Sequence, residues 1–103
     1  MSGLEVGARL RRALARHARR CGLDVTIPSS STTRWASATF TGARHELVLA
    51  LTAGDGAECW LADLPEAELA LPGHLIADLK IVRMRQDGTA LSATLEVLTV
   101  EDR

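Results

Sequence analysis

The strongest constraint on this chain is an amphipathic pattern near its start. Successive residues of an α-helix turn by about 100°, and at that angle the arginines gather in one arc while apolar side chains fall nearly opposite. The arginine arc holds Arg9, Arg12, Arg16, Arg19 and Arg20. The opposite arc holds Val6, Leu10, Leu14, His17 and Cys21. This pattern predicts a surface helix over Leu4–Cys21 whose apolar side packs on a core.

Positive charge is concentrated in this same segment, whereas the rest of the chain is acidic. Residues 1–22 hold six arginines and the single acid Glu5, whereas the remaining residues hold six basic and twelve acidic side chains. Gly22 stands where a glycine commonly ends a helix, and arginines suit the negative end of the helix dipole. Such asymmetry indicates a docking face but identifies no partner.

Length and composition place the chain in one class. Its 103 residues, 47% hydrophobic and 24% charged, predict one globular domain over residues 1–103. No apolar run reaches the roughly 18 residues of a membrane span, and no secretory signal opens the chain, so we expect a cytoplasmic protein with no membrane partner. A single lysine, no asparagine and many alanines and arginines favour a bacterial source.

From Arg34 onward the apolar spacing drops to two, which predicts strands joined by turns. The serine- and threonine-rich residues 28–33 are predicted as a loop. The predicted strands are Arg34–Thr41, Arg44–Thr52, Ala57–Ala62, His74–Arg85 and Thr89–Val100. The expected fold class is α+β, with the N-terminal amphipathic helix packed on one face of a roughly five-stranded antiparallel β-meander.

Turn chemistry sets the expected strand registers, because a slip of one residue exchanges the two faces of a strand. The predicted turns lie at Gly42-Ala43, Gly54-Asp55-Gly56 and Gln86-Asp87-Gly88. They pair Ala36 with Leu49, Ala38 with Leu47, Leu51 with Cys59, and Leu79 with Leu95. The resulting inner face also includes Phe40, Leu61, Leu75, Ala77, Ile81, Leu91, Ala93 and Val97.

These registers leave apolar side chains on the face away from the helix. Trp35 is expected opposite Ala50, and Ala50 opposite Trp60, so that two indoles flank a small residue. One helix covers one face of a sheet, and a large bare apolar face is typical of an interface. The predicted interface or ligand platform is Trp35, Val48, Ala50, Trp60, Val82 and Met84.

The arginines admit three interpretations. A solvated outer helix face is the default, and docking onto the acidic surface of the same or a second subunit comes next. Contact with a polyanion through Arg9, Arg12, Arg16, Arg19 and Arg20 is the least favoured, because the isoelectric point is near 6.3 and aromatic residues are only 3% of the chain. Nucleic acid is therefore not the expected partner.

No cofactor or catalytic motif follows from the sequence. His17 and Cys21 have a spacing that suits two zinc ligands, but a site needs further ligands from His45, Cys59 or His74. Because both cysteines fall on predicted core positions, we expect buried free thiols and no metal. Gly54-Asp55-Gly56 is explained by a turn, so no phosphate-binding loop is predicted.

The expected function is therefore a small non-catalytic interaction or assembly domain, homodimeric through the outer sheet face or a sheet edge. Another protein partner is compatible with the same surface. Two alternatives remain open. One is a ligand-binding or enzymatic domain with a polar cavity near His45 or His74, and the other is a weak nucleic-acid binder that uses the arginine-rich helix.

Overall fold

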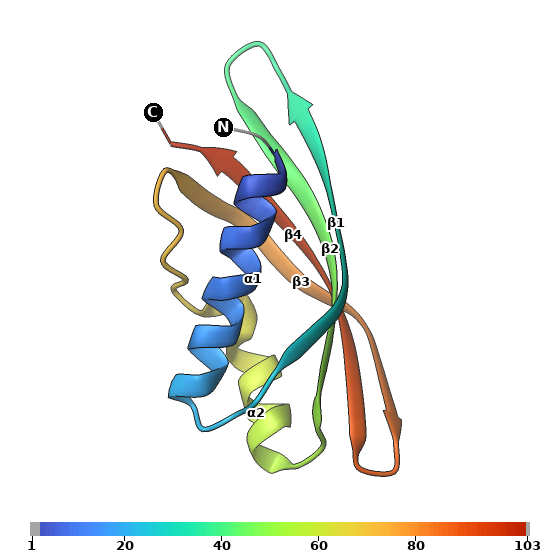
Figure 1. Cartoon of the computed structure of the whole chain (residues 1–103). Coiled ribbons are helices and arrows are strands. Elements are labelled where there is room, and N and C mark those ends of the chain that lie inside the picture. Colours follow the sequence, from blue (N-terminus) through green and yellow to red (C-terminus); the bar gives the residue numbers. More distant parts are fainter. Residues whose placement is uncertain (1–2, 103) are drawn as a thin grey trace.

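The computed structural model describes residues 3–102, which form a helical layer on one face of an antiparallel sheet (Figure 1). The elements in chain order are α1 (Gly3–Arg20), β1 (Thr26–Ala36), β2 (Thr41–Thr52), α2 (Asp55–Asp63), the 3₁₀-helix η1 (Leu64–Glu66), β3 (His74–Asp87) and β4 (Ala90–Glu101). The four strands lie in the order β1-β2-β4-β3. The α+β class, with an N-terminal helix on an antiparallel sheet, is thus confirmed.

Helix α1 forms where the arginine and apolar arcs predict it. Val6, Leu10 and Leu14 are buried against the sheet. Gly22 has a φ of 77° and ends the helix in a Schellman motif, in which the Leu23 N–H donates to the Ala18 carbonyl at 2.9 Å. The periodicity therefore identified both the buried side of α1 and its end.

The predicted third strand, Ala57–Ala62, is wrong, because this segment lies within helix α2. Its buried side chains, Ala57, Trp60, Leu61 and Leu64, are spaced by three and four residues, as on one side of a helix. The sheet consequently has four strands instead of five. It is also no meander, since α2 and η1 carry the chain across so that β4 lies between β2 and β3.

The first hairpin turns at Ser37–Phe40, where the Ser37 N–H donates to the Phe40 carbonyl at 2.8 Å. The predicted turn at Gly42-Ala43 is wrong, and so are the pairs Ala36–Leu49 and Ala38–Leu47. In the observed register Ala36 lies opposite Thr41, and Trp35 opposite Gly42. The serine- and threonine-rich run predicted as a loop belongs to β1.

Gly42 is a strand residue because other groups occupy the space of a side chain. A Cβ at this position would lie 2.1 Å from the Thr99 carbonyl oxygen and 2.7 Å from Cζ2 of Trp35. The indole of Trp35 thus lies on a glycine of the neighbouring strand, an arrangement in which an aromatic ring covers the missing side chain. The glycine is required by close packing, not by a turn.

The second hairpin pairs Asp87 with Ala90 across a two-residue turn that contains Gly88 at φ 60°. The turn is thus Gly88-Thr89, and the predicted turn at Gln86-Asp87-Gly88 is wrong. Strand β3 is irregular at two places, between Ile76 and Asp78 and between Ile81 and Arg83. Together with the irregularity between Ile81 and Arg83, the displaced turn replaces the predicted pair Leu79–Leu95 by Leu79–Val97. Both irregularities are invisible in the period-two pattern, and they change which face some β3 side chains occupy.

Several side chains of β3, among them Leu75 and Met84, consequently lie on faces other than those predicted. Leu75, predicted to be buried, pairs with Val100 on the outer face. Met84, predicted on the outer face, lies opposite Ala93, a buried residue of the inner face.

The core lies between the helices and the inner face of β2 and β4, where the predicted alternation is confirmed. Burial of each large aliphatic side chain in such a core contributes about 1.5–3 kcal/mol. The buried strand residues are Leu47, Leu49, Leu51, Leu91, Ala93, Leu95 and Val97, with Leu79 of β3. The predicted core residues that are instead exposed are Cys21, Ala36, Ala38, Phe40, Cys59, Leu75 and Ala77.

Candidate functional site

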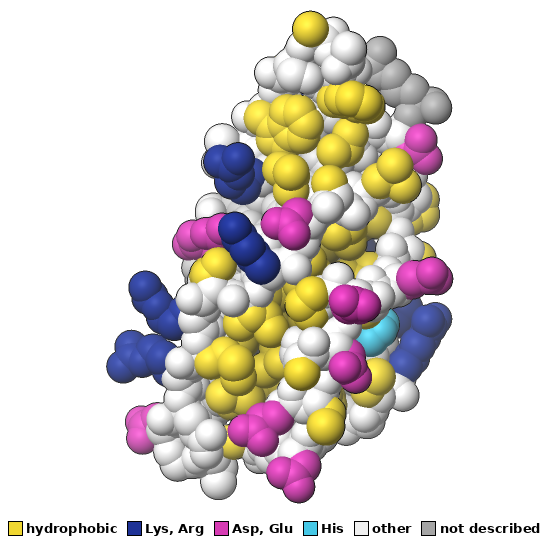
Figure 2. Space-filling view, turned by 180° about the vertical axis from the view of Figure 1, so that it is seen from behind, with side chains coloured by type: hydrophobic (Ala, Val, Ile, Leu, Met, Phe, Trp, Pro, Cys, Tyr) yellow, Lys and Arg dark blue, Asp and Glu magenta, His cyan; other side chains and the backbone are white. Residues whose placement is uncertain are grey.

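The outer face of the sheet carries an apolar row at the end nearest the first hairpin. One residue from each strand contributes, and the row, called the outer row below, is Trp35, Gly42, Val100 and Leu75. Leu75 is 57% exposed, while Trp35 and Val100 are half-buried. Both helices lie on the other side of the sheet (Figure 1). From behind, hydrophobic side chains extend along the molecule's surface, including its hairpin end, and charged groups interrupt them (Figure 2).

Trp35 is the largest member of the outer row. Its indole lies on Gly42, and within residues 3–102 its buried Nε1–H has no hydrogen-bond acceptor. A buried donor without an acceptor is destabilising by about 1–3 kcal/mol. The packing of Trp35 therefore depends on its ring contacts alone.

Charged side chains follow the outer row on the same face. Leu98 lies between Arg44 and Asp78, and the next row holds Lys80 beside Glu96, with their charged atoms 3.8 Å apart. These residues line an open cleft of about 240 Å³. An exposed ion pair of this kind contributes at most about 1 kcal/mol. The outer face thus combines an apolar end with an ionic centre.

The predicted pairing of two indoles around Ala50 is wrong. Trp35 lies opposite Gly42, whereas Ala50 lies opposite Thr26 and Ser92. Val48 also faces outward, opposite Ser29 and Thr94 and apart from the outer row. The three predicted outer residues of β1 and β2 therefore do not form one cluster.

Trp60 lies in α2 and is only 5% exposed. Its Nε1–H donates to His17 Nδ1 of α1 at 2.9 Å. The hydrogen bond and the tilted ring contact between them join the two helices. Trp60 is thus a core residue on the opposite side of the sheet from Trp35.

Val82 and Met84 lie in the half of β3 beyond the outer row. They are 46% and 47% exposed, and Val82 occupies the irregularity between Ile81 and Arg83. Sequence periodicity missed Leu75 as an outer residue because neither irregularity of β3 has a sequence signal. The available signal was Gly42 itself, a glycine inside a strand, which commonly marks close approach of another group.

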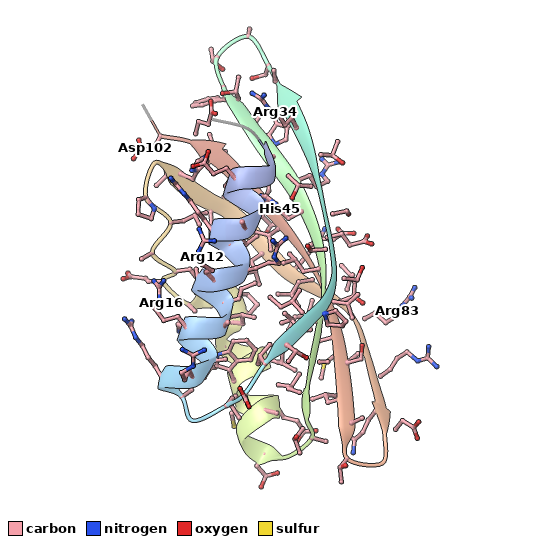
Figure 3. The ribbon with its side chains drawn as sticks, viewed as in Figure 1. Arg12, Arg16, Arg34, His45, Arg83 and Asp102 are labelled. Atoms are coloured by element: carbon pink, nitrogen blue, oxygen red, sulfur yellow. The ribbon has the colours of Figure 1, made fainter. Side chains whose placement is uncertain are left out.

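His45 of β2 is the central polar residue of the inner face, 1% exposed. Thr99 Oγ1 donates to the Ala43 carbonyl at 3.3 Å and is 3.0 Å from His45 Nε2, so it accepts the Nε2 proton. Nδ1 then accepts the proton of Thr32 Oγ1 at 2.9 Å. Both ring nitrogens are thus satisfied by the neutral imidazole. Figure 3 shows His45 between α1 and the sheet.

Burial lowers the pKa of His45 to about 4, with a further contribution from the charge of His74. The imidazole is therefore neutral near pH 7. With both nitrogens bonded and no exposed edge, His45 holds β1, β2 and β4 together. The predicted alternative of a catalytic or ligand-binding cavity gains no support from this residue.

The predicted zinc spacing does not assemble a metal site. His17 accepts from Trp60, and Cys21 is exposed beyond the end of α1. Among the described residues, no group of three or more potential ligands could hold a metal ion. Both cysteines are exposed thiols, which corrects the expectation that they are buried.

The arginines of α1 differ in their contacts. Arg9 pairs with Glu5 at 3.2 Å and donates to the Pro72 carbonyl, and Arg11 donates to Ser30 Oγ at 2.9 Å. No carboxylate of residues 3–102 forms an ion pair with Arg12, Arg16, Arg19 or Arg20, and all four are exposed. Arg12 and Arg16 point away from the sheet (Figure 3).

No protein-family model, curated protein or solved structure matches this chain. Within the part of the chain that the structure describes, no helix has the length and apolarity needed to cross a membrane. Functional inference therefore rests on two surfaces, the outer row of the sheet and the arginines of α1.

Proposed function

We propose that this chain is a non-catalytic assembly domain that forms a homodimer through the outer row. The observation that carries the proposal is an apolar row that crosses all four strands, with Leu75 more than half exposed and both helices on the opposite side. Contiguous apolar surface of this kind favours association over solvation. Tryptophan, the residue most enriched at interface hot spots, lies at one end of the row.

The row suits pairing with a second copy of itself. Two sheets that pack face to face keep their strands roughly aligned, within about 30°. A two-fold axis parallel to the strands would then place β1 of one copy over β3 of the other. Trp35 of each copy would meet Leu75 of its partner, and Gly42 would meet Val100. The large ring and the flat glycine thus lie opposite aliphatic side chains, twice in each dimer.

The sheet edges are less suited to pairing than the face. Strand β3 is an edge strand, but it has two irregularities and presents Lys80, Arg83 and Arg85. The other edge strand, β1, contains Pro28 and a register shift between Thr26 and Ser29. Irregularities, prolines and charges are the features by which natural edge strands avoid pairing. We therefore place the interface on the face.

Sedimentation velocity over about 1 to about 200 µM protein tests the proposal, because mass action makes dimer formation depend on concentration. The wild-type chain should sediment as a dimer in the upper part of this range. Leu75→Arg buries an unpaired charge in the interface and should weaken dimerisation at least about tenfold, which corresponds to about 1.4 kcal/mol.

Met84→Arg is the matched control, since Met84 is also an exposed apolar residue of β3 but lies outside the outer row. It should leave the dimerisation constant nearly unchanged. A wild-type monomer throughout the range, or equal effects of the two substitutions, would show that the outer row is not a dimer interface.

A further inference from the structure

The outer surface of α1 carries a line of cations, Arg12, Arg16, Arg19 and Arg20, called the arginine stripe below, which form no ion pair with any of residues 3–102. Like charges three or four residues apart destabilise a helix by about 0.2–0.5 kcal/mol for each pair. After Glu5 the helix contains no acid that could offset this repulsion. The fold thus keeps an unfavourable concentration of positive charge on one exposed line.

The described carboxylates outside α1 do not neutralise this line. Glu68 shares a small cleft with Arg16, His17 and Arg20, but it is not within ion-pair distance of either arginine. Intramolecular docking onto the acidic surface, the second interpretation of these arginines, is therefore not seen in residues 3–102. An external anion remains the group that would relieve the repulsion.

We infer that the arginine stripe binds the phosphate backbone of a nucleic-acid duplex without reading its base sequence. Guanidinium groups make two parallel hydrogen bonds to phosphate, and the stripe contains arginine only. At a rise of about 1.5 Å per residue, its ends lie about 12 Å apart along the helix axis, which suits several consecutive phosphates. Nucleic acid, the least favoured interpretation of the sequence, becomes the favoured one at this surface.

The surroundings of the stripe favour a duplex over single strands and membranes. Proteins that hold single strands stack bases on aromatic side chains, but Trp35 is on the outer face of the sheet and Trp60 is buried. Membrane-surface helices insert their apolar side, whereas Val6 and Leu10 of α1 are packed in the core. A narrow line of cations on a convex helix can contact the backbone of a duplex without exposed aromatic side chains and without a free apolar side of the helix.

Fluorescence anisotropy with a labelled DNA duplex of about 20 base pairs tests this inference. Four neutralised phosphates give a slope of about −3.6 for log K against log salt, so affinity should fall about 150-fold between about 50 and about 200 mM NaCl. The variant Arg12→Gln, Arg16→Gln, Arg19→Gln, Arg20→Gln should lose most binding and most of the slope. Glutamine is a good helix former, and circular dichroism should show α1 intact.

The matched control removes four charges from the sheet, through Arg34→Gln, Arg44→Gln, Arg83→Gln and Arg85→Gln. It should bind the duplex within about threefold of the wild-type chain at about 50 mM NaCl. If both variants lost the same affinity for the duplex, binding would depend on net charge alone, and the inference would be overturned. No wild-type binding at low salt would also overturn it.

Two further probes test whether the arginine stripe binds a membrane or an acidic protein instead of a nucleic-acid duplex. Tighter binding to vesicles of phosphatidylcholine and phosphatidylserine than to the duplex would assign the stripe to membranes. Equal competition by polyglutamate at the same charge concentration would assign it to acidic proteins. The inference is independent of the proposed dimer, because Leu75→Arg acts on the opposite side of the sheet and should leave duplex binding in place.

Discussion

Gly42→Ala should lower the free energy of unfolding by about 3 kcal/mol, the upper end for an overpacked site. The added methyl would stand 2.1 Å from the Thr99 carbonyl oxygen, a backbone atom that cannot move without opening the β2–β4 pairing. It would also meet the indole of Trp35 at 2.7 Å. Thermal unfolding should show a Tm lower by about 15 °C.

Gly56→Ala is the control for this prediction. Its Cβ would meet only Leu23 Cδ2, at an ordinary 3.8 Å, and the residue is helical. Alanine in a helix is more stable than glycine, so the variant should gain about 0.5 kcal/mol. The same chemical change should thus have opposite signs at the two glycines. A Gly42→Ala variant as stable as the wild type would contradict the close packing of Trp35 on Gly42.

Acid should destabilise the protein by about 3 kcal/mol through His45 alone. The folded protein holds the pKa of this imidazole at about 4, whereas an unfolded chain has a histidine pKa of about 6.5. Between these values the unfolded state binds the extra proton, so stability falls as pH decreases from about 6.5 to about 4. Below this window His45 contributes no further change. Urea titrations at a series of pH values measure the loss.

The variant His45→Gln tests whether the loss of stability in acid comes from His45. A glutamine amide can accept from Thr32 and donate to Thr99, but it does not titrate in this range. The wild-type chain should therefore lose about 3 kcal/mol more than the variant between pH 7 and 4. Parallel pH profiles would show that another group is responsible.

Glu101 affects the stability of the fold at lower pH than His45 does. The hydrogen bond from Thr41 lowers the pKa of its carboxyl group. The contribution of Glu101 is present above its unfolded pKa and disappears as pH falls through the folded value. We therefore expect its contribution to be lost at lower pH than that of His45, and in the His45→Gln variant as well.

The contrast between α1 and α2 shows which elements local patterns can predict. In α1 the period of 3.6 extends over 18 residues, and only a helix satisfies it. In α2 the apolar residues Ala57, Cys59 and Leu61 also alternate, so nine residues fit a strand as well as a helix. The contact of Trp60 with His17, remote in sequence, distinguishes the two.

The candidate site was only partly predictable. Sequence periodicity indicated an apolar outer face and included Trp35 in it. It placed Trp35 beside Ala50 because the glycine at position 42 resembled a turn residue, whereas packing of the indole explains that glycine. Leu75 entered the site only through the irregularity between Ile76 and Asp78, which reverses the alternation along β3.

By itself, the amino-acid sequence determined α1, its arginine and apolar sides, its end at Gly22, and the buried faces of β2 and β4. These features depend on side-chain periods within single elements. Only the tertiary structure decided that α2 is a helix, that β4 lies between β2 and β3, and that Trp35, Val100 and Leu75 share one row. Pairing between strands depends on contacts between distant residues, and one extra residue in a strand shifts every pair beyond it.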